Sequence, residues 1–82
     1  MSTPFKIYLY PNPSRGKVTV HLSEQIEAGS IIEILDISGR KIASRLISNN
    51  SEVFNLDNQP SGLYFIKVTN GSNWATQKMV LK

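Results

Sequence analysis

Gly62-Leu63-Tyr64-Phe65-Ile66-Lys67-Val68 is the stretch that decides the fold, because a turn signal and a second strand-like segment follow it directly. Asn70-Gly71 is a favoured pair in the primed turns of hairpins, and Lys78-Met79-Val80-Leu81-Lys82 ends the chain. Apolar residues alternate along both segments, as they do in half-buried strands. We therefore expect a hairpin that pairs residues 63–69 with residues 74–81 through a loop of two to four residues.

The rest of the chain repeats this pattern, with strand signals about every ten residues and turn residues between them. No helical period persists for about eleven residues, and short loops favour antiparallel neighbours. Two packed sheets bury more apolar surface than one sheet. The sequence therefore predicts an all-β, seven-stranded antiparallel immunoglobulin-like β-sandwich. Its first five strands are expected at residues 5–10, 17–22, 31–37, 40–47 and 52–56.

Length and composition narrow the classes of protein. The 82 residues make one domain, expected at residues 5–82, and we interpret residues 1–4 as the remnant of a linker to a longer protein. The absence of cysteine excludes disulfides, thiolate zinc sites and a cysteine nucleophile. No signal peptide and no apolar run long enough to cross a membrane is visible. The nine cationic residues are spread along the sequence, so we expect no nucleic-acid binding.

The sequence does not predict an enzyme. His21 is the single histidine, and its place in an alternating strand favours a solvated position rather than a catalytic or metal-binding one. Asp36 and Asp57 lie beside turns, where aspartate commonly bonds to the backbone. Asn55, Asp57 and Asn58 could supply oxygen ligands to calcium, but a turn explains them equally well. We expect neither a metal nor a cofactor.

Four segments, in this order and at these separations, resemble one family. They are Tyr10-Pro11-Asn12-Pro13, Asp36-Ile37-Ser38-Gly39-Arg40, Gln59-Pro60-Ser61-Gly62-Leu63-Tyr64 and the terminal Lys78-Met79-Val80-Leu81-Lys82. Over residues 8–82 the chain resembles the type A C-terminal sorting domain of cargo proteins of the type IX secretion system of Bacteroidetes. We call these four segments the motif segments.

The resemblance implies a transport signal. In that family the domain ends a larger precursor whose cargo domain lies on its N-terminal side. The folded domain passes through the periplasm, where the outer-membrane translocon and its shuttle recognise it, and a sortase-like protease at the cell surface removes it. The cargo then reaches the outer-membrane surface or the medium.

The residues themselves suggest how the roles are divided. Pro11, Asn12, Pro13, Asp36, Gly39, Arg40 and Pro60 are expected to be mainly structural, as strand ends and turns. Recognition by the translocon or shuttle is assigned to the terminal residues Lys78, Met79, Val80, Leu81 and Lys82, with Gly62 and Tyr64. The terminal strand is either an edge protected by lysines or a template for strand addition. In the second case, pairing of two such edges in a homodimer is a further alternative.

Two other interpretations stand beside the transport signal. An immunoglobulin-like adhesion or carbohydrate-binding module could use Tyr8, Tyr10 and Trp74 as a sugar-stacking face. A spacer that stabilises a neighbouring domain is the third. The sequence identifies neither the cargo, nor the cleavage site, nor the translocon component that binds first.

Overall fold

The computed structural model describes residues 5–82, and within them seven strands and no helix are found. The strands are β1 (Ile7–Tyr10), β2 (Lys17–Leu22), β3 (Ile31–Asp36), β4 (Lys41–Leu46), β5 (Ser51–Asn55), β6 (Gly62–Asn70) and β7 (Asn73–Leu81). Each lies within two residues of its predicted position at either end. The predicted linker remnant, residues 1–4, lies outside the described residues. Residues 5–82 contain no helix that could span a membrane.

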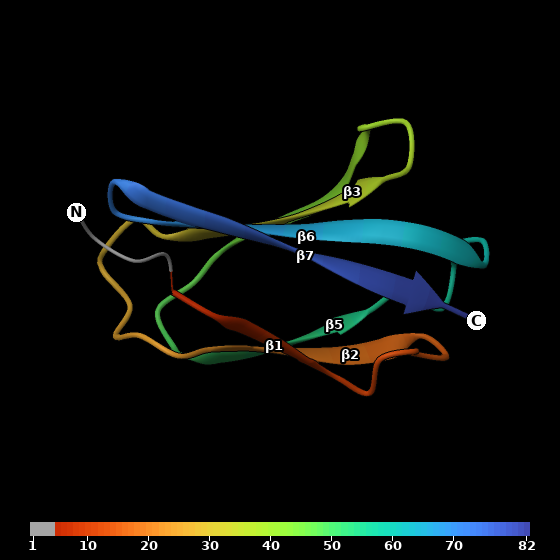
Figure 1. The fold of residues 1–82 in the computed structure, drawn as a ribbon, viewed down its shortest axis with the longest axis horizontal. Coiled ribbons are helices and arrows are strands. Elements are labelled where there is room, and N and C mark those ends of the chain that lie inside the picture. The colour runs from red at the N-terminus through yellow and green to blue at the C-terminus, as the bar shows by residue number, and fades with distance from the viewer. Residues whose placement is uncertain (1–4) are drawn as a thin grey trace.

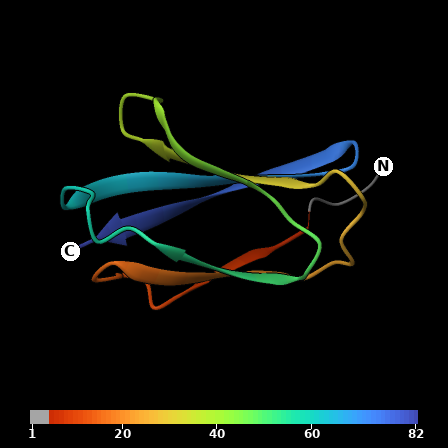
Figure 2. The same cartoon turned by 180° about the vertical axis from the view of Figure 1, so that it is seen from behind.

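Two antiparallel sheets pack face to face (Figures 1 and 2). One has the order β1-β2-β5 and the other the order β4-β3-β6-β7. The all-β sandwich is therefore confirmed. Because β4 pairs with β3 and not with β5, it lies in the sheet of β3, β6 and β7. In an immunoglobulin constant domain the fourth strand instead belongs to the sheet of the first, second and fifth strands.

Alternation places the core as the sequence predicts. Val18, Val20 and Leu22 of β2 and Ile66 and Val68 of β6 are fully or almost fully buried between the sheets. The strand β3, which is nearly continuous in apolar residues, still alternates, with its second and fourth residues in the core and the others partly covered. Burial of each such side chain contributes roughly 1.5–3 kcal/mol to the free energy of folding. This burial must stabilise the domain, because it has no disulfides.

The closing hairpin differs from the prediction in its turn. The pair Asn70↔Asn73 closes a two-residue loop of Gly71 and Ser72, so Asn70 is the last residue of β6 and not a central turn residue. Gly71 alone has a positive φ, of 65°, which fits a turn with glycine in the first central position. Asn70 is buried instead and bonds to Glu27 N, Ser30 Oγ and Gln25 O. It therefore anchors the loop between β2 and β3.

Candidate functional site

The strands β1, β3, β5 and β7 all end at the same end of the sandwich (Figures 1 and 2). Each hairpin reverses the chain, so the loops at residues 11–16, 37–40 and 56–61 and the C-terminal residues meet there. All four motif segments contribute to this end, although they lie far apart in the sequence. We call it the motif end, and the end formed by residues 23–30, 47–50 and 71–72 the opposite end.

Asp36 organises the β3–β4 loop. Its Oδ1 accepts hydrogen bonds from Ser38 N at 3.0 Å, Ser38 Oγ at 2.6 Å and Arg40 N at 3.0 Å. Its Oδ2 lies 3.2 Å from Arg40 Nε. Gly39 N completes the turn by donating to the Asp36 carbonyl at 2.9 Å. The geometry supports the structural role predicted for this segment.

The same contacts act on the charge of Asp36. The hydrogen bond from the Ser38 hydroxyl, then those from the backbone of Arg40 and Ser38 and the Arg40 charge, hold the pKa of this carboxyl below its ordinary value. These contacts all favour the ionised form. The ionised carboxylate in turn pairs with the exposed Arg40 side chain.

Tyr64 and Gly62 shape the β5–β6 loop. The Tyr64 ring is buried, and its hydroxyl donates to the Pro60 carbonyl at 2.6 Å, which ties the loop to the beginning of strand β6. Gly62 begins β6 with a φ of 149°, a region that L-residues rarely adopt. Both residues of the predicted recognition set therefore have a structural task.

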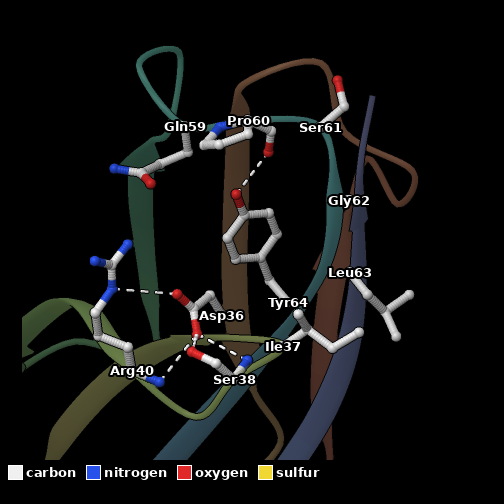
Figure 3. A pocket seen from close by; sticks show the side chains of 10 residues that line it. All are labelled: Asp36, Ile37, Ser38, Arg40, Gln59, Pro60, Ser61, Gly62, Leu63 and Tyr64. Carbon is white, nitrogen blue, oxygen red and sulfur yellow. Dashed lines mark hydrogen bonds and ion pairs between the residues drawn. The ribbon is translucent and has the colours of Figure 1, made fainter.

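These two loops enclose a pocket of about 300 Å³ (Figure 3). The pairs Leu35↔Phe65 and Asp36↔Tyr64 of β3 and β6 bring the loops together. The pocket is lined from one side by residues 36–38 and Arg40, and from the other by residues 59–64. Two of the four motif segments thus form one concavity, which ordinary hairpin pairing assembles.

A third motif segment covers the outer edge of β7. Ser14 N donates to Val80 O at 2.9 Å, and Lys82 N donates to Ser14 O at 2.7 Å, which makes a parallel bridge. Asn12 adds two side-chain bonds, from Nδ2 to Lys78 O at 3.3 Å and from Val80 N to Oδ1 at 3.1 Å. The outward backbone groups of β7 from residue 78 to residue 82 are therefore bonded within the domain, which favours the first of the two alternatives for this strand, a protected edge.

The sequence did not indicate the role of Ser14. This residue is fully buried, and besides its two backbone bonds its hydroxyl donates to Lys17 O at 2.8 Å and accepts from Gly16 N at 3.1 Å. A serine directly after Pro13 and two residues before a glycine favours a turn closed by the serine side chain, and this pattern is present in the sequence. Pro11 and Pro13 have no N–H to donate, so this added edge is a poor template for a further strand.

The side chains of the terminal strand divide into two sets. Met79 and Leu81 lie in the core, whereas Lys78 and Lys82 are exposed and Val80 is partly exposed. The predicted alternation is confirmed. In this fold only the second set is accessible from the surface.

The aromatic residues of the adhesion hypothesis do not share a face. Tyr8 and Tyr10 are exposed on β1 of one sheet, and Trp74 is exposed on β7 of the other. Lys67 Nζ lies over the ring of Trp74, 5.5 Å from the ring centroid. The ring centroids of Tyr8 and His21 are 6.2 Å apart. A single sugar-stacking platform built from these three rings is therefore not formed.

The other candidate groups have structural partners. His21 Nδ1 lies 2.6 Å from Ser51 Oγ on the neighbouring strand, and Asn55 Oδ1 accepts from Asp57 N at 3.0 Å in a side-chain turn. Between residues 5 and 82, no three His, Asp or Glu side chains are grouped so that they could hold a metal ion.

Comparison with known proteins agrees with this geometry. A family model described as "Secretion system C-terminal sorting domain" matches residues 8–82. Among solved structures, the chain is similar to PorZ, an essential bacterial surface component of the type IX secretion system of Porphyromonas gingivalis, with 21% identity and a TM-score of 0.75. That match covers 93% of this chain but only 11% of PorZ, and it shows the fold alone. No curated protein matches the chain. Because the family model covers nearly the whole sequence, the chain belongs to the secretion system C-terminal sorting domains, which are non-catalytic targeting domains of type IX secretion.

Proposed function

We propose that this domain directs a cargo, attached on its N-terminal side, across the outer membrane by the type IX secretion system, and that the motif end is the surface recognised. The observation that carries this proposal is the convergence of all four motif segments on one end of the sandwich, around the pocket and the C-terminal residues of β7. Other turn sequences would also form these hairpins, so hairpin formation alone does not explain the four segments. A shared location gives the four segments a common surface to present.

The contacts at the motif end favour recognition of a folded domain. The terminal edge of β7 is already bonded to Asn12 and Ser14, so strand addition there would first require these bonds to break. Recognition instead uses the exposed Lys78, Val80 and Lys82 side chains and the pocket. Met79, Leu81, Gly62 and Tyr64 act by holding these groups in place.

The remaining steps follow the family. The domain travels through the periplasm with its cargo and is bound by the translocon and its outer-membrane shuttle. A sortase-like protease then removes it at the cell surface. Among the described residues 5–82, no contact favours the adhesion or spacer hypotheses over this one.

Export of a reporter tests the proposal. A signal peptide and a folded fluorescent protein are joined ahead of residues 1–82 and expressed in a type IX-competent bacterium and in its translocon-deficient mutant. We expect reporter outside the competent cell, shortened by about the mass of this domain, and retention in the mutant. Periplasmic retention of an intact fusion in both strains would contradict the proposal.

A further inference from the structure

The charges of this domain are unevenly distributed between its two ends. Six of the nine cationic side chains lie at the motif end, in its loops, at the first residues of β2 and β4 and in the last residues of β7. Asp36, Asp57 and Glu33, whose carboxylate lies beside Lys41, are the acidic side chains in the same region. Glu24, Glu27 and Glu52 lie at or near the opposite end. The six cationic residues are Arg15, Lys17, Arg40, Lys41, Lys78 and Lys82.

Most of this positive charge is not compensated within the fold. All six residues are exposed. Lys41 lies 3.6 Å from Glu33, and Arg40 gives its Nε to Asp36 at 3.2 Å. Across residues 5–82, the structure shows no ion pair for the other four. A net positive surface of this kind attracts an acidic partner and speeds its association.

The pocket lies within this cationic surface. Arg40 flanks it on the β3–β4 side, and β7 runs along the other side, beside Gly62 and Leu63 (Figure 3). The pair Gly62↔Leu81 places Lys82 next to the β5–β6 loop. The pocket therefore lies between the Arg40 guanidinium and the cationic end of the chain.

The lining of the pocket suits an apolar side chain. Leu63, Pro60 and the buried Tyr64 ring contribute apolar surface. Ile37 lies at the rim, and the residue is 74% exposed, an unusual degree for an isoleucine. A concave apolar site with a few polar groups at its margin is typical of a site that anchors one group of a partner.

We propose that the motif end binds an acidic segment of a partner protein, one apolar side chain of which enters the pocket while its carboxylates face the surrounding cations. This inference rests on the proposed function and names the chemistry of the partner. A protein segment is favoured over an anionic membrane surface because a flat lipid surface does not require a pocket with an apolar lining.

A binding measurement tests the chemistry. The probe is a labelled twelve-residue peptide in which glutamate alternates with leucine. One matched peptide carries glutamine for glutamate and another carries serine for leucine. We expect the acidic apolar peptide to bind at low salt, to shift the amide resonances of residues 37–40, 61–64 and 78–82, and to bind about tenfold more weakly at high salt. Each matched peptide should bind at least about fivefold more weakly.

The same titration includes vesicles of phosphatidylglycerol. Binding to the vesicles without binding to the acidic peptide would overturn the proposal in favour of a lipid surface. Equal affinity for the glutamine peptide would also overturn it, as would resonance shifts confined to the opposite end.

Export of variants connects this surface with transport. Lys78→Glu/Lys82→Glu reverses two motif-end charges and should lower export at least about fivefold. The control variant, Lys6→Glu/Ser48→Glu/Ser72→Glu, makes the same change in net charge with exposed residues at the opposite end and should export like the parent.

A second pair of variants tests the pocket. Ile37→Ser removes the exposed rim of the pocket, and Leu46→Ser removes an equally exposed side chain, 71% accessible, from β4. We expect only the first to lower export. If the parent domain is not exported, the proposed function fails. If the parent and all four variants are exported equally, export directed by this domain stands, whereas this inference and the assignment of recognition to Lys78, Lys82 and the pocket fail.

Discussion

The bonds between Asn12 and β7 allow a prediction whose size follows from the structure. Asn12→Ala removes the bonds to Lys78 O and Val80 N while leaving the backbone bridge of Ser14 in place. Each hydrogen bond contributes about 0.5–1.5 kcal/mol net, and the exposure of Asn12 favours the lower value. We therefore expect the free energy of unfolding to fall by about 1 kcal/mol, and Tm by roughly 4–8 °C for a domain of this size.

Two assays measure this effect. Urea unfolding gives the change in stability, and amide hydrogen exchange followed by NMR reports on the edge itself. In the parent domain the Val80 and Lys82 amides should be protected, because both donate to the Asn12–Ser14 segment. In Asn12→Ala the protection of Val80 should fall about fivefold, which is the factor equivalent to the expected loss of about 1 kcal/mol.

Asn58→Ala is the matched control. Asn58 is an exposed asparagine in another loop of the motif end, and its replacement should change stability by less than about 0.5 kcal/mol. A parent domain in which Val80 exchanges as fast as an unstructured peptide would refute the closed edge. An Asn58→Ala variant that is as destabilised as Asn12→Ala would refute the specific role of Asn12.

Three further predictions concern the motif end. Met79→Ala should lower the free energy of unfolding in urea by about 2–5 kcal/mol because Met79 is fully buried, whereas Lys78→Ala should lower it by less than about 0.5 kcal/mol. Equal losses would contradict the division of β7 into core and surface residues. Tyr64→Phe should cost about 1 kcal/mol through loss of the bond to Pro60 O, and an unchanged unfolding midpoint would show that this bond is not formed. Asp36 has a lowered pKa, so its contribution is present above the ordinary value of 3.8 and is lost as pH falls through the folded value. Asp36→Asn should therefore flatten the loss of stability below about pH 4, and a slope identical to that of the parent would contradict this assignment.

The sequence predicted the strands well because each is a local pattern. Alternation along β2 and β6 identified the core face directly, and the loops at Asp36 and Pro60 carried ordinary turn residues. The turn between β6 and β7 was displaced by one residue. Burial of Asn70 against the β2–β3 loop, an interaction across more than 40 residues, determines its place and is not visible in the local sequence.

The site depended on contacts that local patterns do not contain. Asn12 and Lys78 are 66 residues apart, so the closure of the β7 edge could not be inferred from the alternation of β7. Likewise, cations that are spread evenly along the sequence gather at one end because alternate loops of antiparallel hairpins fall on the same side. The sequence indicated the motif residues, and the topology shows that they share a surface.

Site-specific crosslinking during export tests most directly whether the motif end is the surface recognised. A photoreactive amino acid replaces Ser61 at the motif end in one fusion and Ser72 at the opposite end in another, both of which are exposed positions. We expect Ser61, and not Ser72, to form an adduct with a translocon or shuttle component in the competent strain. The adduct should be absent when that component is deleted. Export of both fusions with the adduct formed from Ser72 alone would contradict the account.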